Sequence, residues 1–317
     1  MKTKLTSIIL AAVMLLTALA LGSCGKKEGY TVGICQFAPH EALDAATKGF
    51  KDALTAALGD KVTFDEQNAA GEASVAATQI NSFVSKKYDL ILANATPCLQ
   101  AAYNATSTIP ILGTSVTEYG TALNIKDFNG VCGNNVSGTS DLAPLDEQAG
   151  MIKEWFPEAK KVGLLYCSAE ANSDYQVKSV SRYLTDMGIE AVLYSFSDSN
   201  DIAAVTTKAC SEVDVLYIPT DNTAANCVET IGNIVKTQQT PVIAGEAGIC
   251  KGCGIATLSI SYYDLGYKTG EMAAKILKGE ADIKTMPIEY VSATKLYSKT
   301  RCAELGLTVP EGYSELN

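Results

Sequence analysis

The sequence predicts an α/β protein of two Rossmann-like lobes with parallel sheets, joined by a three-strand hinge. Short apolar strands alternate with segments whose apolar residues recur at helical spacing, which indicates a parallel sheet covered on both faces. The alternation restarts halfway along the chain. The two halves also match unit for unit, since YTVGICQF corresponds to KVGLLYCS and YDLILANATP corresponds to VDVLYIPTDN. This is a duplicated architecture rather than a short solenoid repeat.

The first half contains strands of apolar residues and helices with one apolar face. The segment 41–58 is the clearest helix, because Ala42, Ala46, Phe50 and Leu54 fall on one side of it. The other elements predicted in this half are strands at 30–37, 62–68, 89–93 and 109–113, and helices at 74–87 and 97–105.

The second half repeats this order. Pro157 and Gly188 end two of its helices. The predicted helices are 145–156, 174–187, 202–211 and 223–237, and the predicted strands are 161–166, 190–196, 213–219, 241–244 and 253–260.

The C-terminal tail alternates again, with a helix at 263–278, a strand at 288–291 and a short helix at 300–305. Such a tail is expected to cross between lobes. We expect crossings near 135–143, 259–262 and 284–287, which together form a hinge that bends without unfolding either lobe. Lobe 1 is therefore predicted to comprise 30–140 plus 261–285, and lobe 2 to comprise 141–260 plus 286–317.

The N-terminus is typical of an export signal. Lys2 and Lys4 precede an apolar run that ends in Leu21-Gly22-Ser23-Cys24, so residues 1–23 are predicted to be removed. A cysteine at the cut position indicates a bacterial lipoprotein, in which Cys24 carries lipid and 24–29 is a polar tether. A plain signal peptide or a membrane helix is the alternative, but the run is short for a span. We expect an extracytoplasmic monomer, attached to the membrane only through lipid.

Composition and motifs exclude several function classes. A net charge of -10 and only two arginines argue against nucleic acid as a partner. Dinucleotide, phosphate-loop and nucleophile-elbow motifs are absent from the sequence, so no cofactor and no enzyme activity are predicted. His40 is the one histidine, and a helix-capping or cleft-lining role is favoured over general-base chemistry.

The cysteines beyond Cys24 lie mostly in apolar segments, where cysteine acts as a small buried hydrophobe. The spacing of Cys250 and Cys253 suits a redox pair or half a zinc site. A zinc site would need further ligands, so a local disulfide or free thiols are favoured and no metal site is predicted.

Polar residues follow the strands of both halves. Ligands of open parallel sheets bind beyond the carboxyl ends of the strands. Thr96 and Pro97 also begin a helix, where free N–H groups and a hydroxyl can hold an anion, although simple capping would need the same residues. Several such helix starts at one cleft favour a ligand site. The candidate ligand-binding residues are Gln36, Phe37, Thr96, Pro97, Ser115, Thr117, Ser168, Glu170, Asn172, Asp221, Asn222, Thr223 and Glu246.

These residues suit a small zwitterion. Helix starts and hydroxyls would hold a carboxylate, while Asp221, Glu170 or Glu246 would hold an ammonium group. Phe37 and two tyrosines, Tyr119 and Tyr262, are equally open as pocket walls or as core residues. An amino acid is the ligand class that fits.

Five segments resemble a known family: VGICQFAPHEALDAATKGFKDAL, NATPCLQAA, DEQAGMIKEWFPEAKKVGLLYCSAEANS, YIPTDNT and SYYDLGYKTGEMAAKILKGE. They are similar to the substrate-binding lipoproteins of ABC transporters in the tryptophan/tyrosine-binding group. The resemblance implies a type I periplasmic-binding-protein fold, closure of two lobes on one ligand, and docking on an ABC permease with its ATPase. It places Gln36, Thr96, Pro97, Ser115, Ser168, Asn172, Asp221, Asn222 and Thr223 in the pocket.

The chain departs from that pattern at Cys35, Cys98 and Cys167, and in the segment GEAGICKGCG. These departures affect the part of the pocket that would hold the ligand's side chain. We therefore expect an amino acid as the ligand and, more narrowly, one with an aromatic or large apolar side chain. Two other functions stay open at this point: a sensory ligand-binding lipoprotein, and an exported thiol enzyme using Cys250 and Cys253.

Overall fold

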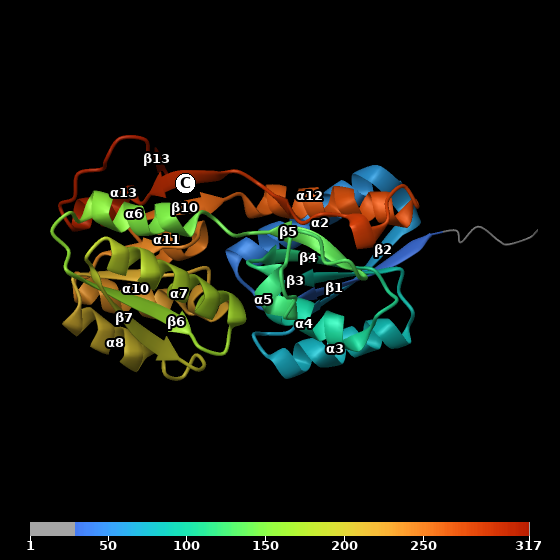
Figure 1. Cartoon of the computed structure of the whole chain (residues 1–317), viewed down its shortest axis with the longest axis horizontal. Helices are drawn as coiled ribbons and strands as arrows, with labels where there is room; N and C mark the ends of the chain where they lie inside the picture. Colours follow the sequence, from blue (N-terminus) through green and yellow to red (C-terminus); the bar gives the residue numbers. More distant parts are fainter. Residues whose placement is uncertain (1–28, 317) are drawn as a thin grey trace, which may run out of the picture.

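The computed structural model describes residues 29–316, which form two α/β lobes lying end to end (Figure 1). The six-stranded sheet of lobe 1 has the order β11-β5-β4-β3-β1-β2, and the seven-stranded sheet of lobe 2 has the order β13-β12-β10-β9-β8-β6-β7. The predicted fold class is thereby confirmed. Cys24, the signal peptide and most of the tether lie outside the described residues.

Lobe 1 is a parallel sheet covered by helices. Its strands are β1 (Tyr30–Gln36), β2 (Val62–Asn68), β3 (Leu90–Asn94), β4 (Ile111–Val116), β5 (Val136–Ser140) and β11 (Glu289–Tyr290). Its helices are α2 (Glu41–Leu58), α3 (Ala73–Ser85), α4 (Thr96–Ala105), α5 (Tyr119–Leu123) and α12 (Tyr262–Leu277), with 3-10 turns at Gly59–Lys61 and Ile283–Thr285. The short helix α5 was not predicted.

Lobe 2 repeats this plan and adds two strands that run in the opposite direction, β12 beside β10 and β13 beside β12. The strands are β6 (Lys161–Cys167), β7 (Glu190–Phe196), β8 (Val215–Ile218), β9 (Val242–Ala244), β10 (Ala256–Ile260), β12 (Ala293–Tyr297) and β13 (Ser314–Glu315). The helices are α6 (Leu145–Trp155), α7 (Ala171–Asp186), α8 (Ile202–Glu212), α9 (Asn222–Asn226), α10 (Val228–Thr237), α11 (Ala247–Cys253) and α13 (Lys299–Glu304).

The two helices α2 and α12 pack against each other on one face of lobe 1. Small residues allow the close approach, because a Cβ added at Gly49 would meet the carbonyl of Tyr263 and one added at Gly266 would meet the carbonyl of Ala46. The start of α12 follows the end of β10 in lobe 2. This tight contact therefore attaches one crossing segment firmly to lobe 1.

The chain crosses between the lobes after β5, after β10 and between β11 and β12. The third crossing lies at 291–292, later than the expected 284–287. The reason is that β11 pairs with β5 at Glu289 and Tyr290, and the Ser137 hydroxyl donates to the Met286 carbonyl at 3.0 Å. Residues 286–290 thus pack with lobe 1 rather than with lobe 2.

Two other predictions in lobe 2 were wrong in detail. The expected strand at 253–260 begins only at Ala256, because 247–253 form α11 with Ile249, Cys250 and Cys253 buried on one side. The expected helix at 223–237 is divided at Cys227 into α9 and α10. Among residues 29–316, no helix is both long and apolar enough to cross a membrane.

Candidate functional site

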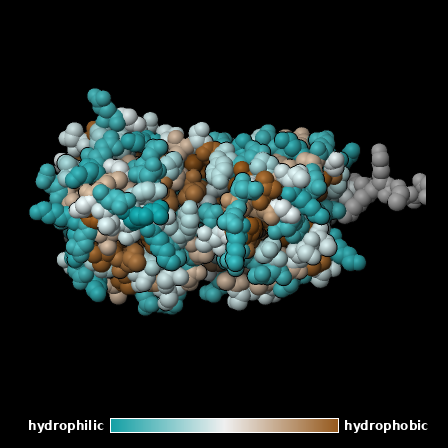
Figure 2. All heavy atoms as spheres, in the orientation of Figure 1, coloured by the Kyte–Doolittle hydropathy of each residue, from teal (hydrophilic) through white to brown (hydrophobic). Residues whose placement is uncertain are grey.

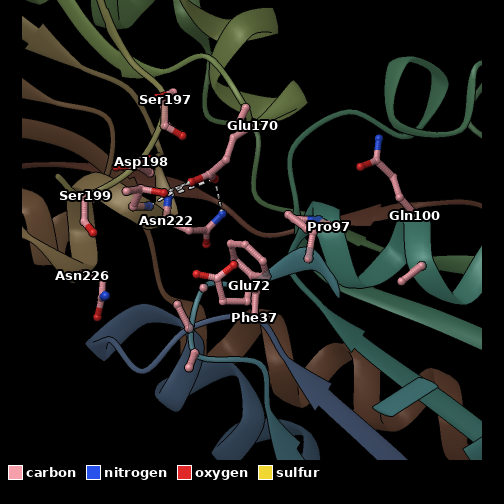
Figure 3. Close-up of a pocket in the computed structure, with 18 of the residues that line it drawn as sticks. Phe37, Glu72, Pro97, Gln100, Glu170, Ser197, Asp198, Ser199, Asn222 and Asn226 are labelled. Atoms are coloured by element: carbon pink, nitrogen blue, oxygen red, sulfur yellow. Dashed lines mark hydrogen bonds between the residues drawn. The ribbon is translucent and has the colours of Figure 1, made fainter. Parts of the chain in front are cut away.

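A cavity of about 460 Å³ lies between the lobes, at the carboxyl ends of the strands (Figure 3). Lobe 1 contributes Phe37 and the starts of α3 and α4, and lobe 2 contributes the loops after β6 and β7 and the start of α9. Five of the candidate residues line it: Phe37, Pro97, Glu170, Asn222 and Thr223. Figure 2 shows that apolar side chains on one face form small patches, some of them where the two lobes meet.

Two buried hydroxyls of lobe 1, those of Thr96 and Ser115, lie outside the described lining of the cavity. Thr96 and Ser115 are 2% and 6% exposed, and neither hydroxyl has a hydrogen-bond partner among the described residues. Ser115 has a φ of 54°, and Ala95, which precedes Thr96, has a φ of 95°. Such backbone strain in residues other than glycine is typical of ligand sites. Both hydroxyls are thus buried donors without a partner in the described chain.

Thr96 is the first residue of α4. Pro97 is its second residue, and within the described chain no side chain caps this helix. The first N–H groups of a helix lack partners inside the helix and attract negative charge. The Thr96–Pro97 region is thus suited to an anion, as the sequence predicted.

The start of α9, in contrast, is already occupied by the protein itself. One carboxylate oxygen of Glu170 accepts from the backbone N–H and the side-chain amide of Asn222 at 3.1 and 2.6 Å. The other accepts from the N–H and hydroxyl of Thr223 at 2.9 and 2.7 Å (Figure 3). The expectation that this helix start binds a ligand anion is therefore wrong. Glu170 makes this side of the cleft negative.

Asp221 and Glu246 are buried helix caps. The Asp221 carboxylate accepts from the N–H groups of Cys167 and Ala224 at 2.7 and 2.8 Å. Burial, and then the charge of Glu170, raise its pKa. Glu246 accepts from the N–H groups of Gly248 and Ile249, and burial raises its pKa to about 7. Of the three carboxylates considered for an ammonium group, only Glu170 lines the cavity.

Three further candidates lie beside the cavity and do not belong to its described lining. The Gln36 amide donates to the Ala38 carbonyl and to Asp44, at 2.9 and 2.6 Å, and so holds the loop after β1. Thr117 is buried, and its carbonyl accepts from the Ser140 hydroxyl at 2.8 Å. The exposed Ser168 donates to the Phe196 carbonyl at 3.2 Å. Their roles in this structure are to shape loops.

Asn172 and Thr96 face a second, smaller space between α4, α5 and α7. The Asn172 amide donates to Glu170 at 3.2 Å and to the Thr220 carbonyl at 3.0 Å, while its carbonyl oxygen has no partner within residues 29–316. An acceptor of lobe 2 and a donor of lobe 1 thus border the same small space.

Asp141 is a buried carboxylate between β5 and α6 that the sequence analysis missed. It follows β5, is 4% exposed and accepts from the Tyr262 hydroxyl at 3.0 Å through one oxygen. The other oxygen is without a partner in the described chain, and burial raises the pKa of Asp141 to about 6. The signal in the sequence is an acidic residue directly after a segment that forms a strand, but 135–143 was expected to be a crossing between the lobes.

The two tyrosines considered as pocket walls have structural partners instead. Tyr119 is buried and donates to the Thr139 carbonyl at 3.0 Å, whereas Tyr262 donates to Asp141. Of the three aromatic candidates, Phe37 is the one in the described lining of the cavity.

The lobes are in contact around the cleft. His40 Nε2 of lobe 1 lies 3.3 Å from the Asn222 side-chain oxygen, and Glu41 pairs with Lys251 of lobe 2 at 3.2 Å. Burial lowers the pKa of His40 although Asn222, Glu170 and Asp44 act to raise it. His40 therefore lies in the cleft between lobes.

The described cysteines are free, and Cys250 and Cys253 are buried in α11, where burial raises the pKa of both thiols. Buried thiols of raised pKa are poor nucleophiles. In residues 29–316 no group of three or more His, Cys, Asp or Glu could hold a metal ion.

Comparison with known proteins gives a consistent result. Residues 31–316 match the family described as ABC transporter substrate binding protein. A tyrosine-binding protein of Clostridioides difficile is 36% identical over 273 residues, which cover 85% of this chain and 79% of the relative.

Two solved structures are informative about lobe arrangement. The ABC domain of Streptococcus pneumonia in complex with L-Trp has a TM-score of 0.86 at 31% identity, covering 90% of this chain and 99% of that one. The ligand-free, open structure of a substrate binding protein with adhesive properties from Clostridium difficile has a TM-score of only 0.69 at 36% identity, covering 90% and 98%. The present arrangement is thus nearer to that of the L-Trp complex. This chain belongs to the ABC transporter substrate-binding proteins, as its segments predicted.

Proposed function

We propose that this protein is an extracytoplasmic, lipid-anchored solute-binding protein of an ABC importer, and that it binds an amino acid with an aromatic or large apolar side chain between its lobes. The observation that carries the proposal is the division of unpartnered buried polar atoms across the cleft. The buried polar atoms without a partner in the described chain include the hydroxyls of Thr96 and Ser115 in lobe 1, and the side-chain oxygens of Asn172 and Asp141.

The α-carboxylate is assigned to the lobe 1 side. Thr96 and Ser115 can donate hydrogen bonds, and the start of α4 adds N–H groups and the positive end of the helix dipole. A carboxylate here would also give partners to hydroxyls that are otherwise unpartnered in the described chain. Satisfying a buried polar group recovers part of its desolvation cost, which is about 1–3 kcal/mol.

The α-ammonium group is assigned to the acidic side, where Glu170, Asn172 and Asp141 present oxygen atoms. Glu170 lines the cavity, but both of its carboxylate oxygens accept hydrogen bonds from the start of α9. It would therefore attract the ammonium group mainly through its charge. This replaces the sequence-based assignment of the ammonium to Asp221, whose carboxylate is 1% exposed and caps α9.

The side chain of the ligand is assigned to the cavity beside Phe37. Burying an aromatic side chain contributes roughly 1.5–3 kcal/mol, so glycine and alanine should bind much more weakly. The relatives support this assignment, since one is named a tyrosine-binding protein and another was solved with L-Trp.

Equilibrium binding of the amino acids to unfolded and refolded protein tests the proposal, because refolding removes ligand carried over from expression. We expect tyrosine, tryptophan or another large apolar amino acid to bind and to raise the unfolding temperature. Tight binding of a sugar or nucleoside, with every amino acid failing, would refute it.

Anchoring and transport need separate tests. Cys24→Ala should release protein without lipid from the membrane fraction, whereas unchanged attachment and mass would contradict lipidation at Cys24. Deleting the neighbouring permease or ATPase gene should abolish ligand uptake in cells. Persisting uptake would contradict the role in an importer.

A further inference from the structure

The cavity between the lobes has two charged groups that the proposed function does not use, Glu72 and Asp198, and Asp198 accepts from the Asn200 N–H. Glu72 precedes α3, lines the cavity and lies next to Phe37 in Figure 3. Its carboxylate has no hydrogen-bonding or ionic partner among the described residues, and it does not cap α3. Glu170, the other glutamate of the lining, is by comparison fully engaged by α9.

The loop from β2 to α3 holds Glu72 in this position. The Gly71 N–H donates to the Phe37 carbonyl at 2.7 Å, and the Ala69 N–H donates to the Gln36 carbonyl at 2.8 Å. Ala70 and Gly71 have φ values of 54° and 84°, which turn the chain sharply just before the helix. Two backbone hydrogen bonds thus tie Glu72 to the strand end that carries the aromatic wall.

The electrostatic surroundings favour a donor rather than an acceptor. None of the described residues that line the cavity is lysine or arginine, while Glu72, Glu170 and Asp198 all line it. The other polar side chains that α4 contributes to the lining are the amides of Gln100 and Asn104. An anionic group placed here would meet like charges, whereas a hydroxyl, an indole N–H or a cation would find a carboxylate.

We infer that Glu72 is a specificity-determining residue that accepts a hydrogen bond from the far end of the ligand's side chain. The inference rests on the proposed function and narrows it: the ligand is an amino acid whose large side chain carries a hydrogen-bond donor, and an acidic side chain is rejected. Phe37 contacts the apolar part of that side chain, and the Glu72 carboxylate accepts from the donor at its far end.

Three ligands that differ at a single position test this. Phenylalanine, tyrosine and 4-carboxyphenylalanine carry hydrogen, hydroxyl and carboxylate at the same ring carbon. We expect the refolded protein to bind tyrosine about tenfold more tightly than phenylalanine, since hydrogen bonds to charged groups are the stronger kind, and 4-carboxyphenylalanine more weakly than either. In Glu72→Ala the preference for tyrosine should fall to within about twofold and the carboxylate analogue should gain affinity.

Matched variants separate the outcomes. Glu72 is exposed, so Glu72→Ala should fold, and Glu72→Gln should keep an acceptor and part of the preference. Asp198→Asn is the control, because Asp198 lines the same cavity but accepts from the Asn200 N–H at 2.8 Å. Equal binding of tyrosine and phenylalanine, or loss of the preference in Asp198→Asn but not in Glu72→Ala, would overturn the inference and leave the proposed function standing. Failure of every amino acid to bind would contradict both this inference and the proposed function.

Discussion

Replacing Thr96 with valine should have opposite effects on stability and on binding. Thr96 is 2% exposed, and its hydroxyl has no partner within residues 29–316. Valine has nearly the same shape without the hydroxyl. In the empty protein the substitution removes an unsatisfied polar group, and in the complex it removes a hydrogen bond to the ligand carboxylate.

The magnitudes follow from these two states. An unsatisfied buried hydroxyl costs about 1–3 kcal/mol, so the empty variant should gain up to about 1 kcal/mol after the change in packing. That corresponds to a rise of about 2–4 °C in the unfolding temperature for domains of this size. Loss of a hydrogen bond to a charged carboxylate costs about 1.5–3 kcal/mol, which weakens binding roughly tenfold to hundredfold.

Thermal unfolding of the refolded, empty protein and isothermal calorimetry with its tightest amino acid measure the two effects. Thr206→Val is the matched control, because the buried Thr206 hydroxyl donates to the Ile202 carbonyl at 2.6 Å in α8, within lobe 2. The control should lower the unfolding temperature and leave affinity unchanged. A Thr96→Val protein that is destabilised with undiminished affinity would refute the assignment of the carboxylate to lobe 1.

Three other results are expected. Glu170→Gln should lower the free energy of unfolding by urea by about 2 kcal/mol or more, because its amide NH2 would face N–H and hydroxyl donors from which the Glu170 carboxylate accepts. Glu212→Gln should cost clearly less, because its amide oxygen can still accept from the Tyr194 hydroxyl, and equal losses in the two variants would contradict the role of Glu170. Affinity for the ligand should fall as the pH drops from 7.5 to 5.5. Burial between the lobes lowers the pKa of His40 from 6.5, so a proton binds the open form more tightly and closure is favoured above pH 6.5. His40→Gln should reduce this pH dependence of affinity, and an unchanged pH profile in the variant would contradict the role of His40. Diamide should leave Cys35 and Cys98 unlinked in the folded protein although their sulfurs lie 3.4 Å apart, because both are buried and burial raises the pKa of the Cys98 thiol; peptide mapping that finds a Cys35–Cys98 disulfide would contradict this.

Residue patterns alone were sufficient to predict the two-lobed α/β fold. Apolar strands such as 190–196 and the apolar face of 41–58 are local signals, and the structure has both elements at the predicted residues. The resemblance of several segments to a known family likewise needed no coordinates. Rules for parallel sheets then placed the ligand edge at the strand ends, and Phe37, Pro97 and Glu170 line the cavity there.

Elements stabilised by distant contacts were not predictable in this way. The helix α11 depends on capping by Glu246 and on burial of Cys250 and Cys253 against neighbouring elements, and no helix was predicted at 247–253. The strand β11 exists through pairing with β5, far away in the sequence, so the position of the third crossing could not be read from local composition.

The roles of the polar strand-end residues were decided by tertiary structure alone. Asp221, Glu170 and Glu246 are similar in sequence context, since each carboxylate lies at a strand end before a helix. In three dimensions all three cap helices, yet Glu170 lines the cavity while Asp221 and Glu246 are buried beside it. Sequence determines which groups follow a strand, because strand ends are marked by local residue patterns. Which of these groups keeps a free hydrogen-bonding atom depends on the partners that folding brings within about 3 Å, and those partners come from other parts of the chain.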